Sequence, residues 1–414
     1  MPYRDQANQP AVIAACVAAG QGMLVALAPL ILARLPVSIG GLGVAIAAGT
    51  IALMIAAPLW ARLAGRVGLC RTLPSALTAY LLVQCAFVAF VLLAIAAPPG
   101  PAVVLTGLCL LRVLHGAAAA GIHPGCQLWA TANTRSEDTL PALARVSAGA
   151  NLGRGLGPAA VLLLLPLGEA AALLGLALVP AAALAMLFRY PPPGDVAAST
   201  AVARPATIGR RLLICLGLAA ASAVVVGQTQ YLLGPLLAWR DVLGSIDLAS
   251  HTGPVAALLA LATAVAVIIQ LSLGRRARRP GRTLALGVGL LWLASLSLQW
   301  ASSLPALTVS LCGLAAGMAL IAPACLALAL TGQSGADRAA VTGWFAVAYT
   351  GGYSVAFATA GIGFAVWAWL PLPGVLLAAA AAGLCACLLA IVFSCDRRAA
   401  RAGHTLFSTG TSKP

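Results

Sequence analysis

The chain has 414 residues, of which 62% are hydrophobic and only 8% are charged, and its mean hydropathy is +1.01. Soluble globular domains carry about 25% charged residues, so this composition excludes a soluble protein and predicts membrane spans. The net charge of +15 does not indicate nucleic-acid binding, because the arginines form short clusters between apolar runs, as the positive-inside rule describes. Ten-residue segments of alternating hydrophobicity, typical of outer-membrane barrels, are absent from the sequence, so the spans are expected to be helices.

A helix needs about 20 apolar residues to cross a bilayer, and the sequence contains twelve runs of this kind. They cover roughly residues 11–33, 39–60, 73–96, 102–128, 141–164, 167–188, 211–237, 252–273, 283–301, 304–330, 339–364 and 367–394. The first run is too long for the core of a signal peptide, so we expect it to be retained as a span.

Basic residues are placed almost entirely on one side of this arrangement. If the N-terminus is inside, all but four of the 24 lysines and arginines fall in cytoplasmic segments, the exceptions being Arg34, Arg112, Arg154 and Arg240. This bias predicts an even number of spans with both termini in the cytoplasm. We expect a multi-pass protein of a bacterial inner membrane.

The only long polar stretch inside the chain, residues 189–210, contains three consecutive prolines and is expected to be a cytoplasmic linker. It divides the chain into an N-terminal six-helix half (1–188) and a C-terminal six-helix half (211–396), followed by a cytoplasmic tail (397–414). The halves share short patterns in the same order. One pattern is Ala64-x-Arg66-x-Gly68 in the first half, which recurs as Ala277-x-Arg279-x-Gly281 in the second. Another is Pro124-Gly125-Cys126, which recurs as Pro323-Ala324-Cys325. These matches indicate a duplicated unit.

Motifs for metal binding and enzymatic catalysis are absent from the sequence. The 11 cysteines mostly fall inside apolar runs, and none forms a pair of CxxC units at metal spacing, so we expect neither a disulfide framework nor a metal site. No HExxH, GxSxG or GxxxxGK[ST] occurs, and Gly153-x-Gly155-x-Gly157 follows no predicted strand. We therefore expect no enzymatic activity and no cofactor.

The fourth predicted span carries four strongly polar side chains, Arg112, His115, His123 and Gln127. At 100° per residue, Arg112 and His123 fall within about 20° of each other, and His115 and Gln127 fall within about 60° of Arg112. An arginine at the centre of a membrane helix costs roughly 2.5–3.5 kcal/mol, so such a stripe is expected to face a bundle interior or a water-filled cavity. Arg154 lies at similar depth in the fifth span. The sequence therefore predicts one polar cavity lined by both arginines and both histidines.

The predicted spans contain no acidic residue in their interior, and this favours an anionic ligand. All nine fall in predicted loops or at span ends, namely Asp5, Glu137, Asp138, Glu169, Asp195, Asp241, Asp247, Asp337 and Asp396. A cationic pocket without a neighbouring carboxylate complements an anion, and guanidinium binds carboxylate or phosphate through two parallel hydrogen bonds. Proton coupling would use His115 or His123, since the ordinary histidine pKa of about 6.5 suits that task.

These residues also have purely structural interpretations, which stay open at this point. Arg112 can bond neighbouring backbone carbonyls, and the side chain of Arg154 can extend along its helix to a more polar depth. His123 precedes Pro124 and can bond carbonyls that are freed at a proline kink.

The loop between the second and third predicted spans reads Ala61-Arg62-Leu63-Ala64-Gly65-Arg66-Val67-Gly68-Leu69-Cys70-Arg71. It resembles the G-x-L-A-D-R-x-G-R-R signature of the major facilitator superfamily. Arg66 and Gly68 match, whereas Gly65 stands in place of the acidic residue. The resemblance covers essentially the whole chain. It implies an all-α membrane protein with twelve transmembrane helices in two pseudo-symmetric six-helix halves.

Two further motifs resemble the drug/proton antiporters of this family. Their fourth span carries an arginine followed by a glycine four residues later, which Arg112 and Gly116 match. Their fifth span carries a G-x-x-x-G-P motif typical of exporters, which Gly153, Gly157 and Pro158 match, although the trailing Gly-Gly is missing. With Gly149, these glycines have the four-residue spacing of close-packing positions.

The resemblance also implies a substrate site between the halves. In this family spans one and seven face the central cavity, which makes Gln21, Gln228 and Gln230 candidate substrate contacts. Three tyrosines of the second half are candidate wall residues: Tyr231, Tyr349 and Tyr353.

The leading hypothesis is a monomeric, proton-coupled exporter of a small anionic or zwitterionic compound, with a carboxylate siderophore as one example. The first alternative is an importer of an organic anion or of a metal–siderophore complex with the same fold. The second is a membrane scaffold or sensor that transports nothing. Arginines in the middle of two spans argue against the second alternative, because they are costly to retain without a use.

Overall fold

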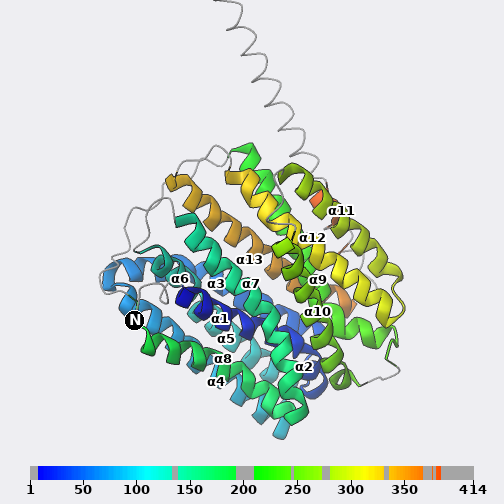
Figure 1. Ribbon diagram of the computed structural model, residues 1–414. Coiled ribbons are helices and arrows are strands. Elements are labelled where there is room, and N and C mark those ends of the chain that lie inside the picture. The colour runs from blue at the N-terminus through cyan, green and yellow to red at the C-terminus, as the bar shows by residue number, and fades with distance from the viewer. Residues whose placement is uncertain are drawn as a thin grey trace, which may run out of the picture.

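The computed structural model describes residues 8–132, 139–192, 209–243, 247–272, 280–330, 335–366, 375 and 379–383, and its regular elements within these ranges are all helices (Figure 1). The α-helices are α1 (Gln9–Ala26), α2 (Ala28–Arg34), α3 (Ile39–Val67), α4 (Leu69–Ala96), α5 (Pro101–Ala119), α6 (Ile122–Thr131), α7 (Thr139–Leu164), α8 (Glu169–Arg189), α9 (Arg210–Trp239), α10 (Thr252–Ser272), α11 (Pro280–Trp300), α12 (Leu304–Leu330) and α13 (Gly335–Val366). Two short 3-10 helices, η2 (Leu165–Leu167) and η3 (Leu248–His251), precede α8 and α10.

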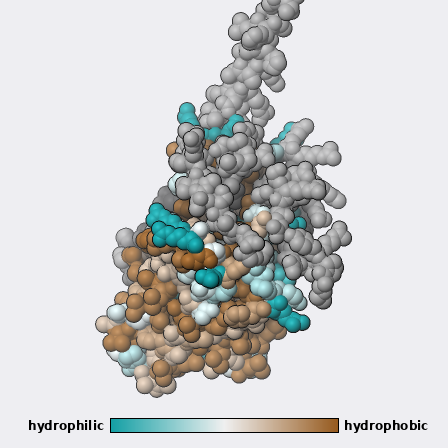
Figure 2. Space-filling model, turned by 90° about the vertical axis from the view of Figure 1, so that its left-hand side faces the viewer, coloured by the Kyte–Doolittle hydropathy of each residue, from teal (hydrophilic) through white to brown (hydrophobic). Residues whose placement is uncertain are grey.

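The helices agree with the predicted spans. Ten segments within the described residues are long and apolar enough to cross a membrane, and α13 occupies the eleventh predicted span. Most of the twelfth, 367–394, lies outside the described residues, as does most of the predicted linker. Figure 2 shows that the described surface on one face is mostly hydrophobic, as expected where lipid surrounds the helices. The all-α membrane fold expected from the sequence is confirmed.

Two of the predicted spans are interrupted helices. The first is divided into α1 and α2 at Leu27, two residues before Pro29, which has no N–H to donate. The fourth is divided into α5 and α6 at Ala120 and Gly121, where Pro124 leaves a backbone carbonyl without its helical partner. The second interruption lies in the middle of the polar stripe, between His115 and His123.

Within the N-terminal half, formed by α1–α8, the backbones of α1 and α7 are in direct contact. A Cβ at Gly153 would lie 2.0 Å from the carbonyl oxygen of Ala15, and Gly149 and Gly157 are equally close to the carbonyls of α1. Only glycine permits this approach, because real Cβ contacts are longer than 3.0 Å. The interpretation of these glycines as close-packing positions agrees with the distances.

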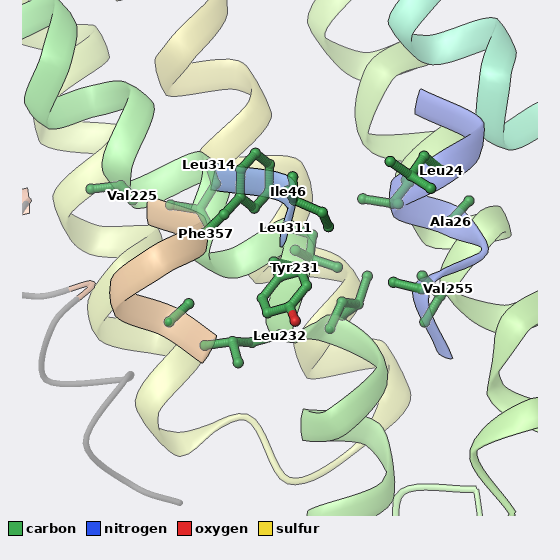
Figure 3. Close-up of a cluster of buried hydrophobic side chains, with 14 of the residues drawn as sticks. Leu24, Ala26, Ile46, Val225, Tyr231, Leu232, Val255, Leu311, Leu314 and Phe357 are labelled. Atoms are coloured by element: carbon green, nitrogen blue, oxygen red, sulfur yellow. The ribbon is translucent and has the colours of Figure 1, made fainter. Parts of the chain in front are cut away.

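The C-terminal half begins at α9, and the two halves share a buried apolar core. Leu24 of α1 and Ile46 of α3 belong to the same cluster as Leu232 of α9 and Phe357 of α13 (Figure 3). The hydroxyl of Tyr231 donates a hydrogen bond to the carbonyl of Ile39 at the start of α3. The halves are therefore joined by packing and by a hydrogen bond at the end of the molecule where α3 begins.

The contact between α3 and α13 becomes looser along the two helices. A Cβ at Gly43 would lie 2.6 Å from the carbonyl oxygen of Phe357, whereas a Cβ at Gly351 would lie 3.8 Å from the nearest atom of Met54. Further along α13, a Cβ at Gly343 would meet no heavy atom within 4 Å. The halves are thus tightly closed at the end that contains α2 and η3, and the α3–α13 contact opens toward the other end.

Candidate functional site

Arg112 and His115 lie inside the N-terminal half, on α5. Arg112 is only 7% exposed, and Tyr80 of α4 lies within range to interact with it electrostatically. The ring of His115 is 4.6 Å from that of Tyr80, measured between centroids. Neither ring nitrogen of His115, nor Nε of Arg112, makes a hydrogen bond in the described part of the chain. This is a buried cation beside an unpaired imidazole.

The backbone of α3 holds Arg112 in this position. A Cβ at Gly49 would lie 2.7 Å from the carbonyl oxygen of Arg112, and a Cβ at Gly116 would lie 1.8 Å from the carbonyl oxygen of Gly49. The two glycines allow the backbones of α3 and α5 to touch next to Arg112, whose side chain is buried in this structure. No ion pair with a described carboxylate balances its charge.

Arg154 of α7 has a different environment. Its side chain is exposed, and it lies within electrostatic range of His123 on α6 and of Tyr349 and Tyr353 on α13. Because α6 belongs to the N-terminal half and α13 to the C-terminal half, side chains from both halves lie within electrostatic range of the guanidinium. His123 in turn lies 3.2 Å from the side-chain amide of Gln127, measured from Nε2 to Nε2. Arg154 is not paired with any described carboxylate.

The electrostatic neighbours group the four cationic or titratable side chains as Arg112 with His115 and Arg154 with His123, and one cavity lined by all four stays a prediction. The electrostatic neighbours of Arg112 are Tyr80 and His115, whereas those of Arg154 come from α6 and α13.

The glutamines and the remaining tyrosine have different environments. Gln228 is buried and donates from Nε2 to the hydroxyl of Thr359, at 2.9 Å, while its Oε1 has no partner among the described residues. Gln21 and Gln230 are half-buried. Tyr231, expected as a wall residue, is only 1% exposed and bonds Ile39 across the closed end. In this conformation Tyr231 is a contact between the halves, not a surface that a substrate reaches.

The loop motif after α3 has a clear backbone role. Arg66 is exposed in the last turn of α3, and Gly68 joins α3 to α4 with a φ of 82°, a left-handed conformation that favours glycine. Pro158 packs against the backbone of α1, where a Cβ at Gly22 would lie 3.0 Å from its ring.

The described residues contain no group of three or more histidine, cysteine, aspartate or glutamate side chains placed to hold a metal ion.

Four residues that the sequence did not single out contribute to the site or to its support. Tyr80 packs on His115, and Thr50 and Ser354 bond each other between the halves. Trp60 donates from its indole to the carbonyl of Ala117, at 2.7 Å, next to the break in the fourth span. Only Trp60 carried a usable signal, because a tryptophan two residues after Pro58 and near the end of a span usually has a polar partner.

Comparison with solved structures shows the same fold in several transporters. PepTSo, a POT family transporter, has a TM-score of 0.69 at 12% identity, covering 94% of this chain and 98% of that one. The nucleoside transporter NupG has a TM-score of 0.66 at 12% identity, covering 94% and 99%. The human organic anion transporter MFSD10 has a TM-score of 0.66 at 15% identity, covering 94% and 100%. No curated protein matches the sequence.

The family is established by the sequence itself. The model of the Major Facilitator Superfamily matches residues 11–357, well over half of the chain. The apolar spans, the interrupted first and fourth helices and the solved structures of the same fold are all consistent with that match. The chain belongs to the Major Facilitator Superfamily and is a multi-pass membrane transporter.

Proposed function

We propose that this transporter exports a small anionic or zwitterionic compound across the bacterial inner membrane by alternating access, with inward proton movement as the driving force. A carboxylate-rich siderophore is the substrate class to test first. Both termini are cytoplasmic in this proposal, and the chain acts as a monomer.

The observation that carries the proposal is the position of Arg154. Its exposed guanidinium lies within electrostatic range of His123 from one half and of Tyr349 and Tyr353 from the other, and no described carboxylate neutralises it. A planar guanidinium with open donors binds a carboxylate or phosphate through two hydrogen bonds. The human organic anion transporter has the same fold, which is compatible with an anionic substrate.

Arg112 and His115 are a second observation that favours proton-coupled transport. A buried cation next to an imidazole with two unpaired nitrogens is costly, and such groups in membrane spans mark ion or proton pathways. In our proposal His115 and His123 carry the coupled protons, because each lies within electrostatic range of a membrane arginine, Arg112 or Arg154.

The packing of the halves supports alternating access. They are closed where α2 meets η3 and where α3 begins, and by the distribution of arginines this end faces outward. A bacterial homologue of the lysosomal transporter Spinster, solved in an inward-facing and occupied conformation, has the same fold with a TM-score of 0.65 at 15% identity. Rocking the halves would open the outer end and close the inner end around Arg154.

The test is transport by the purified chain in proteoliposomes with a panel of carboxylates, phosphates and carboxylate siderophores. Arg154→Gln is expected to abolish transport of the accepted anion, and Arg154→Lys to retain little of it, because an ammonium cannot bind in the bidentate manner. Arg282→Gln, an exposed arginine at the start of α11, is the matched control and should transport normally. Normal transport by both Arg154 variants would refute the anion site.

Direction is tested in the same vesicles. Counterflow under imposed pH gradients of either sign separates proton-driven export from import by the same fold. Metabolite profiling of a deletion strain then identifies the compound, since an exporter's substrate accumulates inside the cells. Accumulation of the substrate only in the medium of the deletion strain would favour the importer.

A further inference from the structure

An apolar pocket of about 420 Å³ opens on the lipid-facing side of the N-terminal half, outside the candidate site. Its walls include Leu59, Trp60 and Leu63 of α3, Val83 of α4 and Leu114 of α5. Three of these, Leu59, Leu63 and Leu114, are exposed large hydrophobic residues in membrane spans, so the pocket opens toward lipid. Pockets that hold small ligands measure about 300–1,000 Å³, which is enough for a segment of acyl chain.

Two arginines continue the same face of α3 toward the end of the helix. Leu59, Arg62, Leu63 and Arg66 have the i, i+3, i+4, i+7 spacing of one helical stripe, and both arginines are exposed. At 1.5 Å per residue, Leu59 lies about 12 Å from the end of α3 at Val67. One leaflet of the hydrocarbon core is about 15 Å thick. A lipid with its headgroup at Arg62 and Arg66 therefore places its acyl chain at the depth of the pocket.

The wall of the pocket is connected to the break in the fourth span. Trp60 donates from its indole nitrogen to the carbonyl of Ala117, and a Cβ at Gly121 would lie 2.6 Å from the Trp60 ring. The same side chain thus lines the pocket and braces the junction of α5 and α6. On one side of this junction is the Arg112 and His115 pair, and on the other is His123.

We propose that this pocket binds one acyl chain of an anionic phospholipid, with the phosphate held by Arg62 and Arg66. The occupied pocket immobilises Trp60 and so stabilises the bent fourth span. The charge of the arginines selects an anionic headgroup, and their place at the cytoplasmic end of α3 in the proposed topology matches the leaflet that is rich in anionic lipid. The effect on transport rests on the proposed function, whereas the binding does not.

The binding test is native mass spectrometry of the full-length chain titrated with phosphatidylglycerol, phosphatidylcholine or inorganic phosphate. We expect phosphatidylglycerol to be retained in preference to phosphatidylcholine, and inorganic phosphate not to compete. Arg62→Gln and Arg66→Gln should each weaken phosphatidylglycerol binding about fivefold. Leu114→Trp, which fills the pocket, should abolish retention of both lipids.

Matched controls exist on the same helix bundle. Leu93→Trp introduces the same ring at a 69% exposed position of α4 outside the pocket, and Arg282→Gln removes an exposed arginine from the other half. Both should bind phosphatidylglycerol as the unaltered chain does. Equal binding of the two phospholipids, unchanged affinity in both arginine variants, or competition by inorganic phosphate would each overturn the proposal. If Leu114→Trp does not fold, as judged by its thermal transition, the affinities of Arg62→Gln and Arg66→Gln for phosphatidylglycerol decide whether the proposed lipid site is correct.

The transport arm compares vesicles with and without phosphatidylglycerol. We expect the accepted anion to be transported faster when phosphatidylglycerol is present, and this dependence to disappear in Leu114→Trp. Arg154→Gln should still bind phosphatidylglycerol while it fails to transport. Failure of the anion proposal therefore leaves the lipid result intact, and failure of lipid binding leaves the anion site intact.

Discussion

The hydroxyl of Ser354 on α13 donates a hydrogen bond of 2.6 Å to the hydroxyl of Thr50 on α3. It links the N-terminal and C-terminal halves between the tight contact at Gly43 and the looser contact at Gly351. The Thr50 hydroxyl in turn donates to the carbonyl of Ala47, at 2.8 Å, so a short chain of hydrogen bonds crosses the boundary between the halves. The bond exists only while the halves are in the present orientation.

Replacing Ser354 with alanine should shift the equilibrium between conformations away from this closed end. A hydrogen bond of this kind contributes about 1 kcal/mol net, so the ratio of the two states should change about fivefold. Spin labels at Ala33 and Ser302, both exposed near the closed end, would report the change as a longer-distance population. Thr350→Val is the control, because the Thr350 hydroxyl bonds only the carbonyl of Ala346 in its own helix. An unchanged distance distribution in Ser354→Ala would contradict the prediction.

Gly153→Ala should destabilise the N-terminal half, because its Cβ would lie 2.0 Å from the carbonyl oxygen of Ala15. Overpacking of this kind costs roughly 1–3 kcal/mol, and here the obstacle is backbone that cannot rotate away. The measurement is the melting temperature in detergent. Gly343→Ala on α13 is the control. A Cβ at this position would meet no atom within 4 Å, so the melting temperature should be unchanged or slightly raised. Equal melting temperatures for the two variants would mean that α1 and α7 separate at little cost.

Arg112→Met should raise the thermal stability of the chain and abolish transport. The side chain is buried without a described carboxylate, so an apolar residue of similar length removes a desolvated charge at small packing cost. Melting temperature and transport of the accepted anion are measured on the same preparation. A variant that is less stable but transports normally would show that Arg112 has only a structural role.

Arg240→Gln should destabilise the end of α11 without affecting substrate affinity. The Arg240 guanidinium donates to the carbonyls of Leu298 and Gln299, at 3.0 and 3.1 Å, and to that of Ala301. These are the carbonyls that a helix C-terminus leaves without intrahelical partners. Burial lowers the pKa of Arg240 from its ordinary value, but an arginine remains charged at neutral pH and the cap is retained.

The readouts for this variant are the melting temperature and hydrogen exchange across residues 295–301. Both should respond in Arg240→Gln, and less so in Arg240→Lys, which keeps the charge but not the planar donors. Arg282→Gln is again the control. A change in substrate affinity at unchanged stability would contradict a capping role.

The order of the described spans could be predicted from apolar run length, because a helix in lipid must satisfy its backbone internally. The second span was expected to end near residue 60, whereas α3 continues to Val67. Its last turns contain Leu63, Arg62 and Arg66, and the run of apolar residues ends before the helix does. Composition therefore finds the membrane-crossing part of a helix but not its capped end.

The site was only partly predictable. Arg112, His115, His123 and Arg154 are polar enough to be singled out by residue type alone, but which of them are electrostatic neighbours depends on how α5, α6 and α7 pack together. Tyr231 was expected beside a substrate, and it bonds the backbone of Ile39 instead. A tyrosine has one apolar face and one polar tip in either role, so its partner is set by tertiary packing that a single sequence does not reveal.

The glycine contacts of α1 and α7 have a consequence for how the molecule moves. Three carbonyls of α1 rest on three glycines of α7, so neither helix can slide or rotate against the other without backbone atoms overlapping. They must travel as one rigid pair when the transporter changes orientation. Arg154 on α7 is therefore displaced whenever α1 moves. A ligand that binds Arg154 and shifts α7 would tilt α1 by the same movement.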